Sequence, residues 1–504
     1  MIRLPKFTLK IPQSLRLLSR LPQMQEDYNN LIQNITSNFK VKTQNPHSVY
    51  ANKMVNLSEI HVYGFDYDYT LVRYTPALIK EIYNNSKQAL VEQLNYPTGL
   101  YDIPFNIKFS TRGLHYDIVE GILMKIDGTH RIQLGTAYIG HRPVKDDDII
   151  RIYGSTHIPI SFMNDTYGNA PRHKRLVHFI DNFSSAEINL LTDVAEFFLS
   201  RNIPYDPVNL YTDVHDAVHE VHVKHQLHDA IINNVEKFIE KPSKITLLLE
   251  RLKNAGKKTF LVTNSPFYFI DAGLKYLTGY PDWKDLFDLI IIDAGKPAFY
   301  TATRPFRLLE PNCKFKKWDT VSGFHPGNVY CQGNVTDLMK YSGWNGQEVI
   351  YIGDHMYSDL VDPVLKFGWR SGAIIPDLER EINRMNTKEY QMTLTTVLQL
   401  EQLIAKYTPL VNTTAEIQTV DFWEIELANE FKNLKENFNK QFGSLFRTIH
   451  GTSYFSRRLA RFADLYTARV DNLLNYSLSE RFYGRRISLP HEAALATIDY
   501  ERII

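Results

Sequence analysis

The chain has 504 residues, enough for two or three lobes around at least one large core, and its 44% apolar and 22% charged residues exclude a disordered or fibrous protein. The 57 Lys and Arg residues nearly balance the 56 Asp and Glu residues, so bulk electrostatic capture of nucleic acid or of an acidic membrane is not expected. The two cysteines, Cys313 and Cys331, exclude a disulfide scaffold, and no apolar run reaches the roughly 18 residues of a membrane span.

The N-terminal segment, residues 1–25, contains no Asp or Glu and holds the basic residues Arg3, Lys6, Lys10, Arg16 and Arg20. Its run QSLRLLSRL has a helical pattern, with Arg16 and Arg20 on one side and leucines on the other. Because presequences imported into mitochondria are basic, poor in acids and amphipathic, this segment predicts a mitochondrial protein. The alternative is a disordered basic tail on a cytoplasmic protein.

Four apolar, β-branched runs end abruptly in polar residues, and helical patterns separate them along the chain. Runs of this kind predict strands that are buried on both faces, as in a parallel sheet covered by helices. We therefore expect an α/β fold with a doubly wound parallel sheet, in which ligands bind at the carboxyl ends of the strands. The runs are IHVYGFDYDYT (60–70), KTFLVTNSP (258–266), LIIIDAGKP (289–297) and EVIYIGDHMYSD (348–359).

The spacing of these runs predicts the domain organisation. Nearly two hundred residues separate the first strand from the second, too many for one crossover, so residues 76–249 are interpreted as a large inserted cap domain. The catalytic core then comprises residues 50–75 and 250–400. Residues 401–504 carry amphipathic helical patterns and are expected to form a helical C-terminal appendage.

Two carboxylates, Asp66 and Asp68, stand at the end of the first predicted strand. Side chains two residues apart on a strand share a face, so both carboxylates can point toward one ligand. Closely spaced carboxylate oxygens suit Mg²⁺, which prefers a few carboxylates, waters and a substrate phosphate. On its own the pair is a weak signal, because turns and helix caps also use aspartates in this way.

The other three strand ends add complementary groups. Thr263 and Asn264 offer a hydroxyl and an amide for phosphoryl oxygens, and Lys296 offers a fixed positive charge. Asp354 supplies another carboxylate for a metal, and Asp359 follows it by five residues. Each residue alone has a structural explanation, but together at four strand ends they predict a phosphoryl-transfer site.

These strand ends carry a resemblance to known proteins. FDYDYTL, LVTNS, DAGKPAFY and YIGDHMYSD resemble the four motifs of the haloacid dehalogenase (HAD) superfamily of phosphohydrolases. Within it the chain is most similar to the cytosolic purine 5′-nucleotidase family, in particular its 5′-nucleotidase domain-containing branch. The likeness runs from about residue 50 to residue 492 and includes GLHYDIVEGILMKID (113–127), GWRSGAIIPDLEREI (368–382), FGSLFRT (442–448) and FADLYTA (462–468).

The resemblance implies a Mg²⁺-dependent phosphomonoester hydrolase that works in two steps. Asp66 is then the nucleophile that forms an aspartyl-phosphate, and Asp68 is the general acid and base. The Asp66 carboxylate, the Asp68 main-chain carbonyl and Asp354 hold the metal, Asp359 supports the metal shell, and Thr263, Asn264 and Lys296 bind the phosphoryl group. Relatives assemble into dimers and tetramers, so the likeness also implies a homo-oligomer.

The predicted cap helix departs from the family pattern. Purine nucleotidases read D-V-R-D-A-V-D-x-V-H, whereas this chain reads DVHDAVHEVHVKH at 213–225, so His215 and His219 replace an Arg and an Asp and only His222 matches. The expected cap aromatic is also not matched in GTAYIG at 135–140. The three histidines are candidate substrate contacts, and the substrate is expected to be a small phosphomonoester such as a nucleoside monophosphate, with purine specificity not assumed.

The altered cap and the appended helices leave a second hypothesis open. The chain could retain the fold and the metal site with little turnover and act as a regulatory or interaction partner. Hydrolysis of a generic phosphate ester, lost in Asp66→Asn, distinguishes the enzyme from this alternative.

Overall fold

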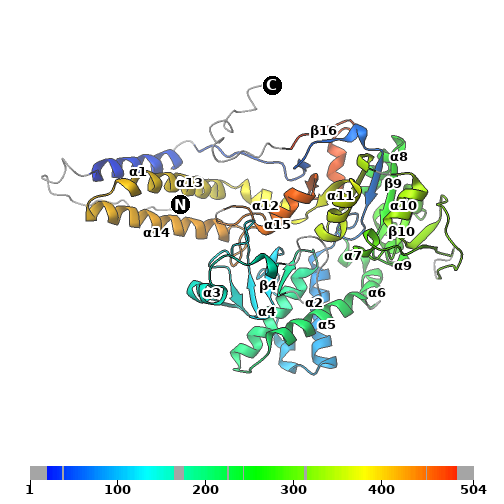
Figure 1. Cartoon of the computed structure of the whole chain (residues 1–504), viewed down its shortest axis with the longest axis horizontal. Helices are drawn as coiled ribbons and strands as arrows, with labels where there is room; N and C mark the ends of the chain where they lie inside the picture. The colour runs from blue at the N-terminus through cyan, green and yellow to red at the C-terminus, as the bar shows by residue number, and fades with distance from the viewer. Residues whose placement is uncertain are drawn as a thin grey trace. The chain divides into compact units, whose positions relative to one another are not determined.

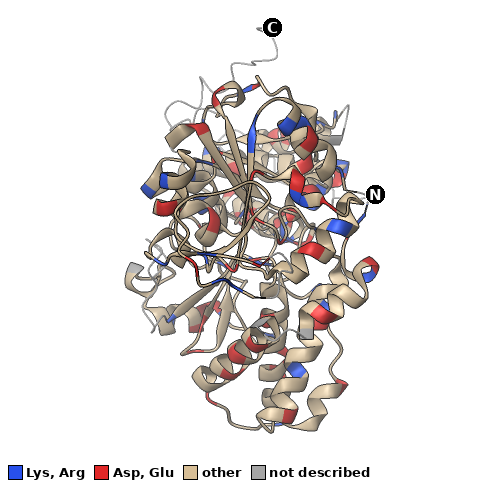
Figure 2. Cartoon of the chain, turned by 90° about the vertical axis from the view of Figure 1, so that its right-hand side faces the viewer, with Lys and Arg blue, Asp and Glu red and all other residues tan. Residues whose placement is uncertain are grey.

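The computed structural model describes residues 20–36, 39–163, 175–223, 226–241, 243–310, 315–344, 346–449 and 451–484. These residues fall into two compact units (Figure 1), one within Met1–Pro46 and Arg380–Ser444 and one within His47–Glu379 and Leu445–Ile504. Lys and Arg are interspersed with Asp and Glu along the elements in Figure 2, in keeping with the net charge of +1.

A nine-stranded sheet forms the centre of the larger unit. Its seven inner strands are parallel, and an antiparallel strand closes each edge. The order across the sheet is β1 (Tyr50–Ala51), β15 (Leu465–Thr467), β14 (Arg370–Ile374), β13 (Val349–Gly353), β3 (Val62–Phe65), β9 (Lys258–Val262), β10 (Leu289–Ile292), β12 (Val329–Gln332) and β11 (Phe306–Leu308).

Every residue of the central strands β3, β10 and β13 is buried, so both faces of the sheet are covered. Close packing explains a glycine in β3, because a Cβ at Gly64 would lie 2.2 Å from Cζ of Phe260. The helices between and around the core strands are α8 (Ile245–Asn254), α9 (Phe267–Thr278), α10 (Val335–Ser342), α11 (Asp362–Phe367), α12 (Asp377–Met385) and α15 (Tyr454–Phe462). The predicted doubly wound parallel sheet, with a large insertion and with helices toward the C-terminus, is confirmed.

The order of the strands reverses at β3, and this reversal locates the site. From β3 the chain continues through β9, β10 and β12 on one side, whereas β13, β14 and β15 lie on the other side. Open α/β sheets bind ligands at such a switch point, outside the carboxyl ends of the strands.

The long insertion after β3 builds an antiparallel sheet with helices. The sheet has the order β7 (Arg142–Pro143), β6 (Tyr138–Ile139), β5 (Ile122–Met124), β4 (Leu114–Asp117) and β8 (Leu176–Phe179). The helices of this cap are α2 (Pro76–Gln93), α3 (Asp146–Tyr153), α4 (Ser184–Ser200), α5 (Pro207–Val223), α6 (Gln226–Asn233) and α7 (Val235–Phe238).

The C-terminal part of the chain differs from the helical appendage expected from residue 401. Strand β15 joins the main sheet, and β16 (Arg481–Phe482) pairs with β2 (Val55–Asn56). Helices α13 (Lys388–Tyr407) and α14 (Thr414–Glu436) instead belong to the smaller unit. The compact division therefore falls near residue 380, because the apolar faces of these helices are buried against each other and against α1.

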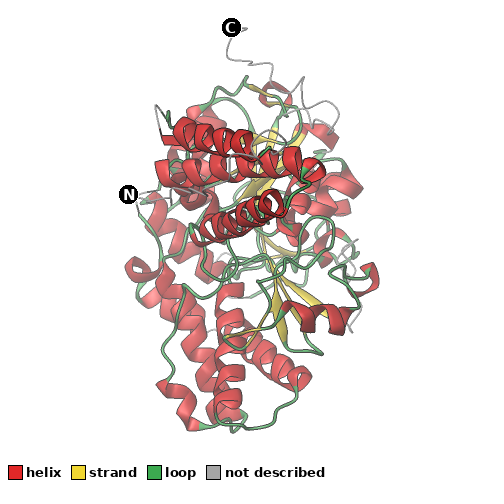
Figure 3. Ribbon diagram, turned by 90° about the vertical axis from the view of Figure 1, so that its left-hand side faces the viewer, coloured by secondary structure: helices red, strands yellow, loops and turns green. Residues whose placement is uncertain are grey.

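The smaller unit consists mainly of α1 (Leu21–Thr36) and the hairpin of α13 and α14 (Figure 3). Met24 and Tyr28 of α1 are buried with Trp423 of α14, and the Tyr28 and Trp423 rings stack with centroids 6.0 Å apart. Residues 20–25 of the expected basic presequence thus belong to a packed region, whereas its first 19 residues lie outside the described part of the chain. Within that part, no helix combines the length and apolarity that crossing a membrane requires.

Candidate active site

The carboxyl ends of four parallel strands bring the predicted phosphoryl-binding residues together. Asp66 directly follows β3, Thr263 follows β9, and Asp354 follows β13. The ladder continues one residue past two of these strands, since Asp66 N donates to Ile352 O at 2.9 Å and Thr263 N to Ile291 O at 3.0 Å. Main-chain hydrogen bonds to neighbouring strands therefore fix the backbone positions of Asp66 and Thr263.

Lys296, four residues beyond β10, is the electrostatic centre of the site. Its Nζ lies 2.8 Å from Asp66 Oδ1 and 2.7 Å from Asp359 Oδ1, and its side chain is 2% exposed. Nζ also donates to the Tyr351 hydroxyl at 3.1 Å. Burial lowers the pKa of Lys296, but the charges of Asp359 and Asp66 outweigh it and hold the pKa above its usual range. The ammonium is therefore a permanent positive charge.

Asn264 contacts Lys296 through the main chain. Its Oδ1 accepts from Lys296 N at 2.6 Å, and its Nδ2 donates to Lys296 O at 3.0 Å. The amide predicted to bind phosphate thus also positions the lysine. Thr263 is fully buried, and its Oγ1 accepts from Ser265 N at 3.1 Å.

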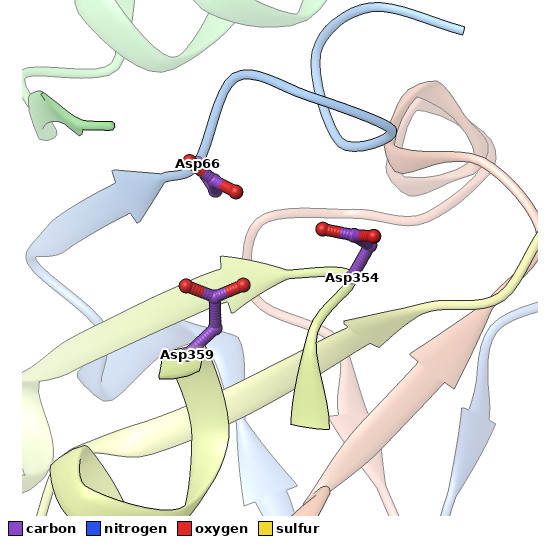
Figure 4. A group of neighbouring side chains, drawn as sticks. All are labelled: Asp66, Asp354 and Asp359. Carbon is purple, nitrogen blue, oxygen red and sulfur yellow. The ribbon is translucent and has the colours of Figure 1, made fainter. Parts of the chain in front are cut away.

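Three carboxylates, Asp66, Asp354 and Asp359, face one another across the strand ends (Figure 4). One ligand atom of each lies within 4.8 Å of the others, and Asp359 is fully buried. Gly353 permits this packing, because a Cβ there would stand 2.5 Å from Cβ of Asp359. Hard carboxylate oxygens in this arrangement fit a divalent cation.

The pKa values of these acids reflect their crowding. Burial raises the pKa of Asp66 to about 7. The Lys296 ammonium opposes this shift in part, and the Asp359 carboxylate adds to it. Burial, together with the charges of Asp359 and Asp66, holds the pKa of Asp354 well above its usual range. Three acids around one ammonium carry an excess of negative charge, which either protons or a bound cation must compensate.

Asp68 is held apart from this group of three acids. Its Oδ1 accepts from the Tyr74 hydroxyl at 2.5 Å, and its Oδ2 accepts from the Ser265 hydroxyl at 2.6 Å. Ser265 is the last residue of the LVTNS motif, whereas Tyr74 lies outside the predicted site residues. A tyrosine eight residues after the first aspartate carries no sequence signal of this contact.

The cap reaches the site through Asn182 and Phe183, which precede α4. Asn182 Nδ2 donates to Asp354 Oδ2 at 2.7 Å. The Phe183 ring lies 5.0 Å from the Tyr69 ring and 5.1 Å from the His222 ring, between centroids. Sequence reasoning sought the cap aromatic in residues 135–140 and missed Phe183, which lies between β8 and α4.

The three candidate histidines occupy different surroundings along α5. His222 donates from Nδ1 to Val218 O at 2.8 Å and lies against Phe183, at the boundary with the core. His215 and His219 are exposed, and their rings stack with centroids 6.5 Å apart. His215 pairs with Glu187 at 2.9 Å, a contact that raises the pKa of the imidazole although burial opposes it. The structure thus brings His222, rather than all three histidines, next to the aromatic group near Asp68.

Fold and site together define the class: a parallel α/β hydrolase of phosphoric monoesters, with acids at the switch point and a cap above them. The model of the 5′ nucleotidase family matches residues 49–494. The chain therefore belongs to this family.

Two relatives match most of the chain. The 5′-nucleotidase domain-containing protein 2 of Rattus norvegicus is 45% identical over 453 residues, covering 90% of this chain and 81% of the relative. The protein of that name from Homo sapiens is 44% identical over 453 residues, covering 90% and 86%. Among solved structures, CbbY of Rhodobacter sphaeroides in complex with phosphate covers 62% of this chain and 86% of its own at 14% identity, with a TM-score of 0.25.

Proposed function

We propose that the protein hydrolyses phosphomonoesters with the help of Mg²⁺ and through an aspartyl-phosphate on Asp66. The observation that carries the proposal is the contact of Asp66 with the buried Lys296 ammonium, 2.8 Å away, beside the acids Asp354 and Asp359. A carboxylate held against a fixed cation at a strand end is placed to attack phosphorus, and the same cation offsets the charge of the transferring phosphoryl group.

The residues of the site fit a magnesium ion. Asp66, Asp354 and the main-chain carbonyl of Asp68 would hold it, since Mg²⁺ favours a few oxygen ligands plus water and phosphate. Both oxygens of Asp359 already accept hydrogen bonds, from Lys296 Nζ and from His355 N, which suits a supporting role for this residue. When bound, such an ion supplies positive charge for the phosphoryl oxygens.

The proton steps fall to Asp68. In the first step an oxygen of Asp66 attacks phosphorus, the bond to the ester oxygen breaks, and Asp68 gives its proton to the departing alcohol. In the second step Asp68 takes a proton from water, the water oxygen attacks phosphorus, and the bond to Asp66 breaks. Phosphate leaves, and both carboxyl groups return to their starting states.

The substrate is proposed to be a nucleoside monophosphate or a related aromatic ester. Phe183 and His222 place two rings beside Tyr69 at the boundary between cap and core, and rings of this kind stack on a base. His219 and His215 continue the line along α5 as further candidate contacts. Without the Arg and Asp of the purine nucleotidases, the hydrogen-bond pattern no longer specifies a purine.

The test is Asp66→Asn, assayed with a chromogenic aryl phosphate and a panel of nucleotide and sugar phosphates, with Mg²⁺ and with a chelator. We expect the variant to lose at least about 10⁴-fold in kcat, and the chelator to abolish wild-type turnover. Asp319→Asn is the matched control, because this aspartate is exposed and distant from the site in sequence. A wild-type protein that is inactive on every ester would favour the regulatory hypothesis instead.

We also propose that the basic N-terminal segment directs the protein to mitochondria and that the protein forms a homo-oligomer, as implied by the resemblance. Because Met24 is buried in α1, a processing site is expected before Leu21 rather than at residue 25. Imaging of tagged protein with and without residues 1–19, and its mass in solution, test these two points. A cytoplasmic location of both forms would overturn the first.

A further inference from the structure

The acid–base residue is held by a tyrosine outside the strand-end motifs. The Tyr74 hydroxyl donates to Asp68 Oδ1 at 2.5 Å, and Tyr74 is 5% exposed. Ser265 donates to the other oxygen, Oδ2, at 2.6 Å. With one donor on each oxygen, the carboxylate has a defined orientation before any substrate arrives.

Tyr74 lies in one of the two chain segments that join core and cap. These linkers, residues 73–75 and 238–240, pair with each other: Tyr74 and Ile239 form an antiparallel bridge. Thr75 N donates to Phe238 O at 2.8 Å, and Glu240 N donates to Arg73 O at 2.9 Å. The backbone that carries the Tyr74 ring is therefore tied to both crossings into the cap.

The ring of Tyr74 also contacts both sides of this boundary. Its centroid lies 5.2 Å from that of Tyr69 in the core loop and 6.4 Å from that of Phe183 in the cap. Phe183 in turn contacts His222 on α5. A continuous set of contacts thus joins Asp68, through Tyr74, to the cap residues proposed to meet the substrate.

We propose that Tyr74, held in the paired linkers between core and cap, is a positioning residue that orients the Asp68 carboxylate. The inference rests on the proposed function, because it gives Asp68 the role of proton donor to the leaving oxygen. An alkoxide is a poor leaving group and needs that proton, whereas an activated phenolate departs without it. Loss of the Tyr74 hydroxyl should therefore slow the two kinds of ester unequally.

The experiment compares Tyr74→Phe with wild type on glycerol 2-phosphate and on 2,4-dinitrophenyl phosphate, in the presence of Mg²⁺. We expect kcat/KM for the alkyl ester to fall about 10–100-fold and kcat/KM for the activated ester to change less than about threefold, because kcat/KM reports the steps up to departure of the alcohol, whereas the attack of water is common to both esters. Tyr83→Phe is the matched control: its hydroxyl donates to Asp193 at 2.6 Å within the cap, and it should treat both esters alike. Ser265→Ala, which frees the other oxygen of Asp68, should reproduce the unequal loss if Tyr74→Phe is unstable.

The outcomes separate the two proposals. Equal losses of kcat/KM on both esters in Tyr74→Phe and Ser265→Ala, or no loss in either, would overturn the positioning role while wild-type activity still supports the phosphatase. If the wild type hydrolyses neither ester, the proposed function fails and the role of Tyr74 fails with it. An unequal loss of kcat/KM confined to the alkyl ester supports the positioning role of Tyr74.

Discussion

The strand-end acids and the cap helix α5 serve the same site but are held in different ways. Asp66 follows a strand whose ladder continues through its own N–H, and the Lys296 side chain beside it is 2% exposed. On α5, the side chain of His215 is 50% exposed and is held by a hydrogen bond to Glu187 and by ring contacts within its own helix. The groups proposed to react are therefore fixed by the main chain and by burial, whereas His215 and His219 of α5 lie exposed outside that buried group. This difference is consistent with strand-end motifs that resemble the family pattern and a cap helix that departs from it.

After the loss of the proposed nucleophile in Asp66→Asn, the largest effect should come from removing the positive charge at the strand ends. In Lys296→Met the buried carboxylates of Asp66 and Asp359 lose the ammonium that both contact, at 2.8 and 2.7 Å. We expect kcat on any phosphate ester to fall about 10³-fold or more, and the free energy of unfolding to fall by about 3–5 kcal/mol in the absence of a divalent cation. Steady-state kinetics and denaturant unfolding measure the two effects.

Lys258→Met is the control for this charge effect. Lys258 pairs with Asp288 at 2.8 Å, but its side chain is 56% exposed, so the pair should contribute less than about 1 kcal/mol. Similar losses of stability in the two variants would contradict the distinction between the buried strand-end cation and an ordinary surface ion pair.

A smaller and more selective effect is expected at the cap. His222→Ala removes the ring that lies 5.1 Å from the Phe183 ring. If these rings stack on a base, KM for a nucleoside monophosphate should rise about 2–10-fold, with kcat nearly unchanged and glycerol 2-phosphate unaffected. An equal change in kcat for both substrates would instead place His222 in the phosphoryl-transfer machinery and would break the division between the two regions.

The difference between main-chain and tertiary positioning also explains which site residues could be predicted from the sequence. Asp66, Thr263 and Asp354 were predictable as neighbours because parallel strands end at one edge, so strand pattern alone brings them together. The contact of the Tyr74 hydroxyl with Asp68, by contrast, depends on the pairing of two linkers that lie about 165 residues apart in the chain. No local sequence pattern encodes this pairing. Phe183 was missed for a similar reason, since only the cap's tertiary packing places it beside Tyr69.

In the C-terminal region, an amphipathic pattern predicts a helix but does not predict which elements pack against it. Residues after 401 carry amphipathic helical patterns, and α14 forms as expected, but its apolar face is buried against α1 and α13. A pattern of apolar residues identifies the face that must be covered and does not identify what covers it. The short strand β15 has only three residues, too few for a clear alternation, and it was not predicted.

The smallest effect is expected from substitution of His215. It tests whether the half-exposed pair of His215 and Glu187 contributes as little to stability as its exposure indicates. The hydrogen bond to Glu187 raises the pKa of His215 in the folded protein. Burial opposes this shift, and the negative charges of Glu187, Asp216 and Asp181 add to it. Because the pKa of His215 is higher in the folded protein than in the unfolded chain, the protonated imidazole stabilises the fold. This contribution is fully present at pH values below the unfolded pKa of about 6.5 and is lost as the pH rises through the folded pKa. His215→Gln should therefore lower Tm at pH 6 by about 1–2 °C and leave it unchanged near pH 9, because a half-exposed pair is screened by solvent. Glu187→Gln should lower Tm at pH 6 in the same way, and the double variant should lose no more than either single one. A Tm difference that stays constant from pH 6 to pH 9 would mean that His215 acts through packing and not through its charge.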